Sequence, residues 1–240
     1  MDHPSTEAIY PTATQFIESV LRLAPHIAAF DCDGTLWSGD AGETFFDWEL
    51  KRGVLLEDVA AAMRARYAQY KAGNVSEEDM CGEMVTMHQG LSDSAVMEAA
   101  TEFMTSHFPG HVFPEMKQLV QQLDRQGCEI WAVSSSNEWL IRAGMKEFGI
   151  PENRILAAKV ELKHGIVTDK LVRVPSGPGK PKALREAAGK KIHAAFGNSR
   201  WDIDMLVMAT HAFAVNPNPD LETTAHQRGW TIYFPDGTSR

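Results

Sequence analysis

The sequence predicts an α/β fold: a Rossmann-like parallel sheet with helices on both faces, plus a helical insertion. Four short apolar segments, at residues 26–31, 128–134, 192–198 and 210–216, have the character of buried parallel strands. Helical patterns lie between them, and alternation of strands with helices is typical of parallel sheets. Polar residues stand at the carboxyl ends of these segments, the edge at which open α/β sheets bind ligands.

The first elements are a helix at residues 12–23, where Phe16 and Val20 share one face, and the strand at 26–31. The stretch from residue 37 to about 110 carries helical patterns and no convincing strand. We therefore expect an all-helical cap at 37–111, inserted after the first strand into a core formed by residues 1–36 and 112–240.

The second strand, at 128–134, lies between two helical patterns. Residues 159–174 then alternate around a His-Gly turn, which predicts a β-hairpin. The loop PSGPGKP follows this hairpin and carries Lys180 into the next helical pattern. The third and fourth strands, at 192–198 and 210–216, resume the sheet, so this loop lies within the core.

Composition restricts the classes of function. The chain has 240 residues and a formal net charge of −9, which argues against nucleic-acid and anionic-membrane partners. We find no apolar run long enough to span a bilayer and no secretory signal pattern at the start. The three cysteines, at positions 32, 81 and 128, are far apart and form no CxxC pair. We expect a reduced cytoplasmic protein, monomeric or homodimeric, that takes a small molecule.

The first strand ends in a pair of carboxylates, Asp31 and Asp33, followed by Gly34 and Thr35. Residues two apart on an extended chain share one side, and Gly34 permits a sharp turn. Such a pair suits a divided task in which one carboxylate attacks while the other manages a proton. A calcium loop also begins in this way, but its next acidic ligand and its glycine are missing here. A strand end with solvated acids is the simple structural alternative.

Three other segments add polar groups to the same edge. Ser134 and Ser135 end the second strand and are expected to meet the N–H groups of a helix start, an anion site. Lys180 can neutralise phosphate charge, and Asn198 with Asp202 offers oxygen ligands for Mg²⁺. Each segment alone is also explained by helix capping or by a solvated lysine. Their occurrence in this order is much more specific.

These four segments resemble the haloacid dehalogenase superfamily, in the branch that contains phosphoserine phosphatases. The resemblance spans about residues 26–220 and includes the position of the helical cap. It implies Mg²⁺-dependent hydrolysis of a small phosphomonoester through a phosphorylated aspartate. The implied roles are nucleophile for Asp31; proton donor and then base for Asp33; loop shaping for Gly34 and Thr35; phosphate binding for Ser134, Ser135 and Lys180; and metal binding for Asp31, Asp33, Asn198 and Asp202.

Two positions depart from that family pattern. Asn198 stands where the family usually has a metal-binding aspartate, so the site loses one negative charge. Phosphoserine phosphatases also hold the substrate carboxylate with a cap arginine, and Met84 stands at that position here. Three other arginines of the cap, Arg52, Arg64 and Arg66, are possible substitutes.

The entrance of the cap carries Asp40 and Glu43 among several aromatic residues. Acids and aromatic rings together can receive an ammonium group on the leaving alcohol. The alternative is that the aromatic residues form the cap core and the acids cap a helix.

Two other functions remain open at this point. A binding module could keep the fold without turnover, which Asn198 favours and the second carboxylate, Asp33, opposes. A phosphotransferase would pass the phosphoryl group from Asp31 to an alcohol in place of water.

Overall fold

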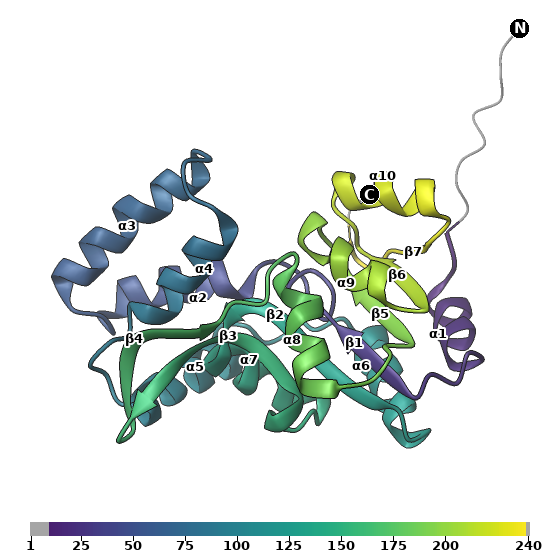
Figure 1. The fold of residues 1–240 in the computed structure, drawn as a ribbon, viewed down its shortest axis with the longest axis horizontal. Helices are drawn as coiled ribbons and strands as arrows, with labels where there is room; N and C mark the ends of the chain where they lie inside the picture. The colour runs from purple at the N-terminus through teal and green to yellow at the C-terminus, as the bar shows by residue number, and fades with distance from the viewer. Residues whose placement is uncertain (1–9, 239–240) are drawn as a thin grey trace, which may run out of the picture.

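The computed structural model describes residues 10–238 and shows one seven-stranded sheet (Figure 1). Its strands are β1 Ile27–Phe30, β2 Glu129–Asn137, β3 Ile155–Lys163, β4 Ile166–Arg173, β5 Ala194–Gly197, β6 His211–Val215 and β7 Thr231–Tyr233. Its α-helices are α1 Ala13–Leu21, α2 Ala41–Arg52, α3 Glu57–Lys71, α4 Glu77–Thr86, α5 Asp93–Ser106, α6 Pro114–Arg125, α7 Glu138–Met145, α8 Gly179–Ala188, α9 Ile203–Met208 and α10 Pro219–Arg228. Short 3₁₀ turns cover Lys146–Phe148, Glu152–Arg154 and Arg200–Asp202.

The strand order is β4-β3-β2-β1-β5-β6-β7, and every neighbouring pair is parallel except β3 with β4. The chain moves from β1 to one side of the sheet with β2 and later to the other side with β5. The carboxyl end of β1 is therefore the point at which strand order reverses, where ligands bind in sheets of this kind.

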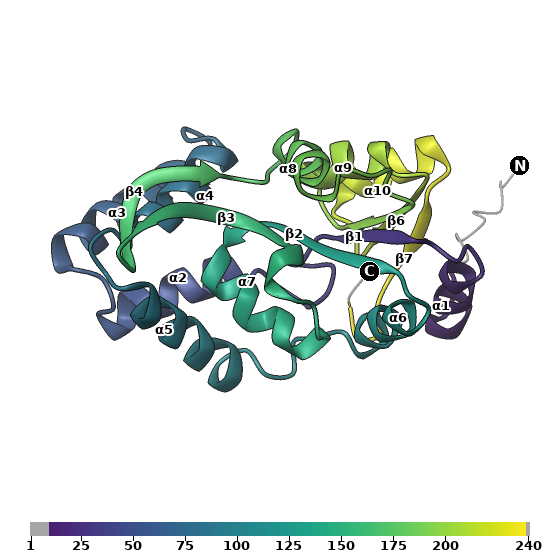
Figure 2. The same ribbon diagram turned by 60° about the horizontal axis from the view of Figure 1, so that its bottom comes forward.

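Helices cover both faces of the sheet (Figure 2). One face packs against α1, α6 and α7 and the other against α8, α9 and α10, each around its own apolar cluster. Strand β1 shows why: Ala28 and Phe30 belong to the first cluster, and Ile27 and Ala29 to the second. A strand buried on both sides needs this continuous apolar sequence. The predicted fold class is thus confirmed.

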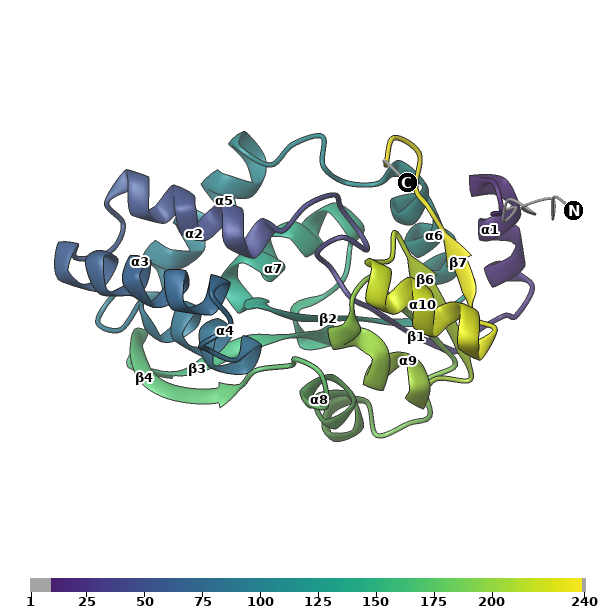
Figure 3. The same ribbon diagram turned by 90° about the horizontal axis from the view of Figure 1, so that it is seen from above.

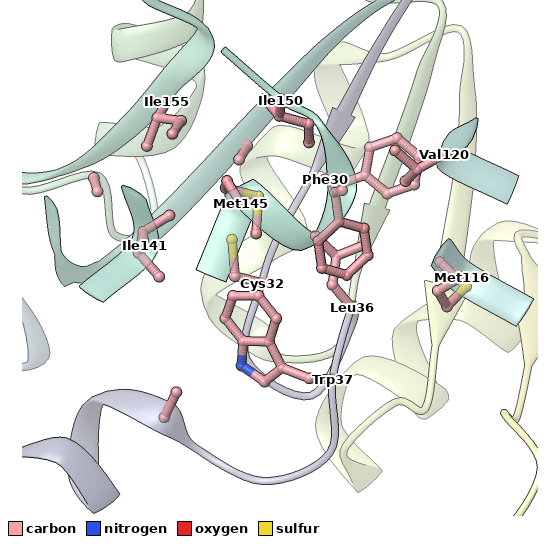
Figure 4. Packing of buried hydrophobic residues seen from close by; sticks show 14 of the residues in the cluster. Phe30, Cys32, Leu36, Trp37, Met116, Val120, Ile141, Met145, Ile150 and Ile155 are labelled. Atoms are coloured by element: carbon pink, nitrogen blue, oxygen red, sulfur yellow. The ribbon is translucent and has the colours of Figure 1, made fainter. Parts of the chain in front are cut away.

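Close packing continues into the segment after β1. Phe30, Cys32, Leu36 and Trp37 all point into the first cluster, between α6 and α7 (Figure 4), and none is exposed. Cys32 occupies the opposite side of the chain from Asp31 and Asp33, as alternation along an extended strand requires. This packing fixes the backbone that presents the two acids.

The insertion consists of α2, α3, α4 and α5 and lies beside the β3–β4 hairpin (Figure 3). Helix α4 packs on both strands of the hairpin, and α5 packs along α7, where the Trp139 indole N–H donates to Asp93 at 2.7 Å. The connections into and out of the insertion lie side by side, because Ser38 N–H donates to His111 C=O and Phe113 N–H to Leu36 C=O. The division into core and cap at residues 37 and 111 remains a prediction.

A buried polar pair lies inside the insertion. His88 Nε2 and Glu49 Oε1 are 2.7 Å apart, and neither side chain is exposed. Burial lowers the pKa of His88, but the charge of Glu49 and its hydrogen bond outweigh burial, so the pKa is raised overall. The pair ties α2 to the segment between α4 and α5.

The structure differs from the sequence expectations at three places. Strand β2 runs to Asn137, so Ser134 and Ser135 lie on the strand, and α7 begins only at Glu138 with Asn137 as its N-cap. The first half of β3 pairs with β2, so the hairpin is an extension of the main sheet. Strand β7 was not expected, since its three residues are too short for a clear pattern. Within residues 10–238, no helix combines the length and apolar character needed to cross a membrane.

Candidate active site

A cavity of about 470 Å³ lies at the carboxyl ends of β1, β2, β5 and β6, between the core and the insertion. The predicted residues that line it are Asp31, Asp33, Gly34, Asp40, Glu43, Ser135, Lys180 and Asn198. Parallel strands end at one edge of the sheet, which brings together residues that are up to 167 positions apart. The other predicted residues, Thr35, Ser134 and Asp202, lie in the surrounding wall, where they are buried.

Asp31 and Lys180 form the centre of this wall. The Lys180 ammonium group donates to Asp31 Oδ1 at 2.7 Å and to Asp202 Oδ1 at 2.5 Å. The Thr35 hydroxyl donates to Asp31 Oδ2 at 2.7 Å. The carboxylate of Asp31 is therefore held at both oxygens, and its 6% exposure is on the cavity side.

Burial and nearby charges alter the protonation of this group. Burial, together with the charge of Asp202, raises the pKa of Asp31 to about 7 in the absence of a bound cation, although Lys180 opposes the rise. Burial also disfavours the charged form of Lys180, but Asp202 and Asp31 outweigh it and raise the pKa of Lys180. We conclude that Lys180 is charged and that its charge is shared between two acids.

Asp202 is held by several donors at once. Its Oδ2 accepts from the backbone N–H groups of Asn198 and Ser199, both at 3.0 Å, and from the Ser199 hydroxyl at 3.2 Å. Its Oδ1 accepts from Lys180. With both oxygens engaged and no exposure, Asp202 positions Lys180 and the turn after β5. Its predicted role as a direct metal ligand remains a prediction.

Asp33 links the segment after β1 to the start of the insertion and to the end of β2. Its Oδ1 accepts from the Trp37 indole N–H at 2.8 Å and from Ala41 N–H at 2.6 Å. Its Oδ2 accepts from the Ser136 hydroxyl at 2.8 Å. Because Ala41 is the first residue of α2, the orientation of Asp33 depends on where this helix begins.

Two glycines allow parts of this site to approach closely. Gly34 has φ +75°, and a Cβ there would lie 1.8 Å from Asn198 Nδ2. Gly42, on α2, lies so near Ser136 that a Cβ would come within 2.6 Å of the hydroxyl oxygen. The turn after β1 therefore requires glycine at position 34, whereas glycine at position 42 leaves room for the Ser136 hydroxyl.

The oxygen atoms at the edge of the cavity suit a hard cation such as Mg²⁺. Available donors are the Asp31 carboxylate, the Asp33 backbone carbonyl and the Asn198 amide. Residues 10–238 contain no group of three His, Cys, Asp or Glu side chains arranged for a metal.

The phosphate-binding expectation centres on Ser134 and Ser135. Ser134 is buried and its hydroxyl accepts from the Ser136 N–H at 3.1 Å. Ser135 lines the cavity, and its hydroxyl donates to Glu77 Oε1 at 3.4 Å. The N–H groups come from the end of β2 and not from a helix start, because α7 begins further along.

The insertion supplies the other wall of the cavity with Tyr67, Tyr70, Glu77, Met80, Cys81 and Met84, besides Asp40 and Glu43. Asp40 is the N-cap of α2, and Glu43 forms an ion pair with Lys71 at 3.0 Å. Burial, followed by the charge of Asp33, raises the pKa of Asp40 to about 7. Asp40 is exposed to solvent by surface area, but it lines the cavity among several other acids.

The three cap arginines that could replace the missing arginine have other partners. Arg52 pairs with Glu102 at 2.6 Å, Arg66 pairs with Glu83 at 2.7 Å, and Arg64 donates to the Leu50 carbonyl. None of the three is among the described residues that line the cavity. Met84 does line it, at the position expected for the arginine.

Sequence reasoning missed several residues of this site. Ser136 and Glu77 were not singled out, although Ser136 stands in the same serine run as Ser134. Trp37 was expected only as one of the aromatic residues at the cap entrance. Trp201, Asn216 and Asn218 also line the cavity. The serine run could have indicated Ser136, and Trp37 is only four residues from Asp33 in the sequence. The place of Glu77 follows from tertiary contacts alone.

Comparisons with known proteins give the family and the fold relatives of this chain. The family model for haloacid dehalogenase-like hydrolases matches residues 28–207. A histidinol-phosphatase of Neisseria meningitidis serogroup C is 25% identical over 218 residues, covering 86% of this chain and 97% of that protein. A Bordetella pertussis protein of unknown function superposes with a TM-score of 0.76 at 21% identity, covering 86% of this chain and 97% of that one. A phospho-aspartyl intermediate analogue of phosphoserine phosphatase gives a TM-score of 0.57 at 16% identity, covering 87% and 92%.

The fold and the family match together define an α/β hydrolase. The chain belongs to the haloacid dehalogenase-like hydrolase family, whose model matches three quarters of its length. The resemblance to the branch with phosphoserine phosphatases is confirmed, as is the prediction that the protein is an enzyme of the phosphatase type.

Proposed function

We propose that this phosphatase hydrolyses a small phosphomonoester through a phosphorylated Asp31, with Mg²⁺ as its cofactor. The observation that carries the proposal is the position of Asp31 at the cavity, held by Lys180 and Thr35 and followed two residues later by Asp33. A nucleophilic carboxylate, a second acid and a buried cation are the parts that phosphoryl transfer requires.

In the proposed reaction, an oxygen of Asp31 attacks phosphorus, the bond from phosphorus to the alcohol oxygen breaks, and Asp33 gives that oxygen a proton. Water then attacks phosphorus, Asp33 accepts its proton, and the bond from phosphorus to Asp31 breaks. The products are the alcohol and inorganic phosphate, and both carboxyl groups return to their starting states. Trp37, Ala41 and Ser136 orient Asp33 for both transfers.

Phosphatases of this family generally depend on Mg²⁺, and we propose that Asp31, the Asp33 carbonyl and Asn198 hold it here. When bound, the ion neutralises charge on the phosphoryl oxygens and on Asp31. Lys180 supplies the remaining positive charge from the other side, and Ser134 and Ser135 contribute hydrogen bonds. Asp202 keeps Lys180 in place.

Two relatives define the substrates to try first. The named activities are histidinol-phosphatase for the Neisseria protein and phosphoserine phosphatase for the solved structure. We propose that substrates of this size are accepted, because the cavity of about 470 Å³ is large enough for a small phosphorylated metabolite. We also propose a cytoplasmic location, which the free state of Cys32, Cys81 and Cys128 supports.

The test is release of inorganic phosphate from a panel containing p-nitrophenyl phosphate, histidinol phosphate and phosphoserine, with and without Mg²⁺. We expect Mg²⁺-dependent release by the wild type that falls by at least about 10³-fold in Asp31→Asn, since the nucleophile is lost. Folding of the variant is checked by circular dichroism.

Release that persists in folded Asp31→Asn would refute the phospho-aspartate route. Phosphoryl groups appearing on added alcohols, in place of free phosphate, would identify a phosphotransferase.

A further inference from the structure

The cavity is lined by more acidic than basic side chains. Among residues 10–238, five carboxylates line the cavity, and the only basic side chain that does so is Lys180. Lys180 is already shared between Asp31 and Asp202. A phosphate bound at Asp31 would have its alcohol part in the same cavity as the acids of the insertion.

Those acids are not equivalent. Asp40 uses Oδ1 to cap α2 through Glu43 N–H at 2.8 Å, and Glu43 is neutralised by Lys71 at 3.0 Å. Glu77 receives only neutral donors: the Tyr70 hydroxyl at 2.7 Å and, more distantly, the Ser135 hydroxyl at 3.4 Å. Within the described chain, Glu77 has no basic side chain at ion-pair distance.

The position of Glu77 relates it directly to the reaction. Its partner Ser135 belongs to the proposed phosphate-binding strand end, so Glu77 lies one hydrogen bond away from the bound phosphate. Tyr67 and Tyr70 line the same cavity, and aromatic rings provide faces that attract cations. Lys71 Nζ already lies over the Tyr67 ring, 5.3 Å from its centroid. A positive group two or three carbons from the ester oxygen would meet this carboxylate and these rings.

We propose that the leaving alcohol carries an ammonium group, which Glu77 binds with Tyr67 and Tyr70 beside it. This inference rests on the proposed function and adds the chemical class of the substrate, an amino alcohol phosphate. A substrate carboxylate finds no matching cation, because Met84 and not an arginine lies in the wall. Phosphoserine is therefore expected to be a poorer substrate than an amino alcohol phosphate without a carboxylate.

The experiment compares two esters that differ in one group: ethanolamine phosphate, which ends in an ammonium, and propyl phosphate, which ends in a methyl. Each is tested as a substrate and as a competitive inhibitor of p-nitrophenyl phosphate hydrolysis. Competitive inhibition gives the ratio of the two esters' binding affinities even where their turnover is slow. We expect the wild type to bind ethanolamine phosphate about ten-fold or more tighter than propyl phosphate, because a hydrogen bond to a charged partner contributes an affinity difference of this size.

Glu77→Gln keeps the shape and the Tyr70 contact but removes the charge. We expect it to bring the amine-to-methyl ratio close to one while leaving propyl phosphate within about three-fold of wild type. Glu78→Gln is the matched control, since Glu78 is exposed on the same helix outside the cavity. Glu77→Lys is a second variant and should favour phosphoserine over ethanolamine phosphate.

The inference would be overturned if the wild type showed an amine-to-methyl ratio near one, or if Glu77→Gln lost the same activity on both esters. In either case, hydrolysis of p-nitrophenyl phosphate would still uphold the proposed function. If no ester is hydrolysed in the presence of Mg²⁺ by folded wild type, the proposed function fails and this inference fails with it.

Discussion

Asn198 stands where the resemblance to the family leads us to expect a metal-binding aspartate. An amide oxygen can ligate Mg²⁺, but it lacks the charge that a carboxylate would add. We predict that Asn198→Asp tightens Mg²⁺ binding by roughly ten-fold, measured by isothermal titration calorimetry. Asn218→Asp is the control, because it adds the same charge to the cavity wall at a residue outside the proposed ligand set, which contacts Asn198 only through its backbone N–H, donated to the Asn198 carbonyl at 2.7 Å.

If both variants gained the same Mg²⁺ affinity, the gain would come from the added negative charge in the cavity and not from a change of ligand at position 198. Unchanged Mg²⁺ affinity in Asn198→Asp would remove Asn198 from the proposed metal site.

Asp31 gives a second prediction at the same scale, from its pKa of about 7 in the absence of a cation. A raised pKa means that Asp31 is protonated below pH 7, and Mg²⁺ must displace that proton. The apparent Mg²⁺ affinity should therefore fall by up to about ten-fold per unit as pH drops below 7 and level off above it. Titrations between pH 5.5 and 8.5 measure this directly.

Buffers with different ionisation enthalpies should report proton release on Mg²⁺ binding below pH 7 and little above it. Affinity independent of pH over this range would contradict the prediction.

The sequence could identify those site residues that stand directly after a predicted strand. Asp31, Asp33 and Asn198 follow buried apolar strands, and such strand ends must meet at one edge of a parallel sheet. Glu77 could not be identified in this way, because its place at the cavity depends on how α4 packs on the hairpin. Ser134 was expected at a helix start, and the longer β2 shows that local pattern fixes element ends poorly.

At the scale of elements, the start of α2 controls the orientation of Asp33. Ala41 N–H contacts Asp33, and Gly42 allows Ser136 to reach the same carboxylate. We predict that Gly42→Ala lowers kcat by about ten-fold with little change in Tm. The new Cβ displaces the Ser136 hydroxyl, while alanine is otherwise favoured in a helix.

A double-variant cycle with Ser136→Ala checks this mechanism. If Gly42→Ala acts by displacing the Ser136 hydroxyl, it should lower kcat little further in a protein that already carries Ser136→Ala. Independent, additive losses would show that the substitution acts elsewhere.

The predicted elements themselves were recovered because their patterns are long or strongly apolar, as in α1 and β1. Strand β7 has only three residues, and its place beside β6 is decided by tertiary pairing. The hairpin was expected from alternation around His164 and Gly165, but its continuity with β2 depends on a register that alternation does not specify.

At the scale of the whole molecule, a net charge of −9 repels a phosphate dianion before it reaches the site. We predict that kcat/KM for p-nitrophenyl phosphate rises about two-fold or more when KCl increases from about 20 to about 150 mM at constant free Mg²⁺. Salt screens this repulsion. An amino alcohol phosphate, with its compensating charge, should show a weaker dependence.

A fall of kcat/KM with added salt would contradict the prediction and indicate an attractive field around the entrance.

The adjacent connections of the insertion have a consequence for how such enzymes diversify. Because residues 36–38 run beside 111–113 and are joined by backbone hydrogen bonds, the chain leaves and re-enters the sheet domain at almost one point. The insertion is thus a side branch whose removal would leave a gap that a tight turn can close. Lids could be exchanged between related enzymes at this junction without altering strand order. The exchange would have to keep the face of α5 that meets α7, where Asp93 contacts Trp139.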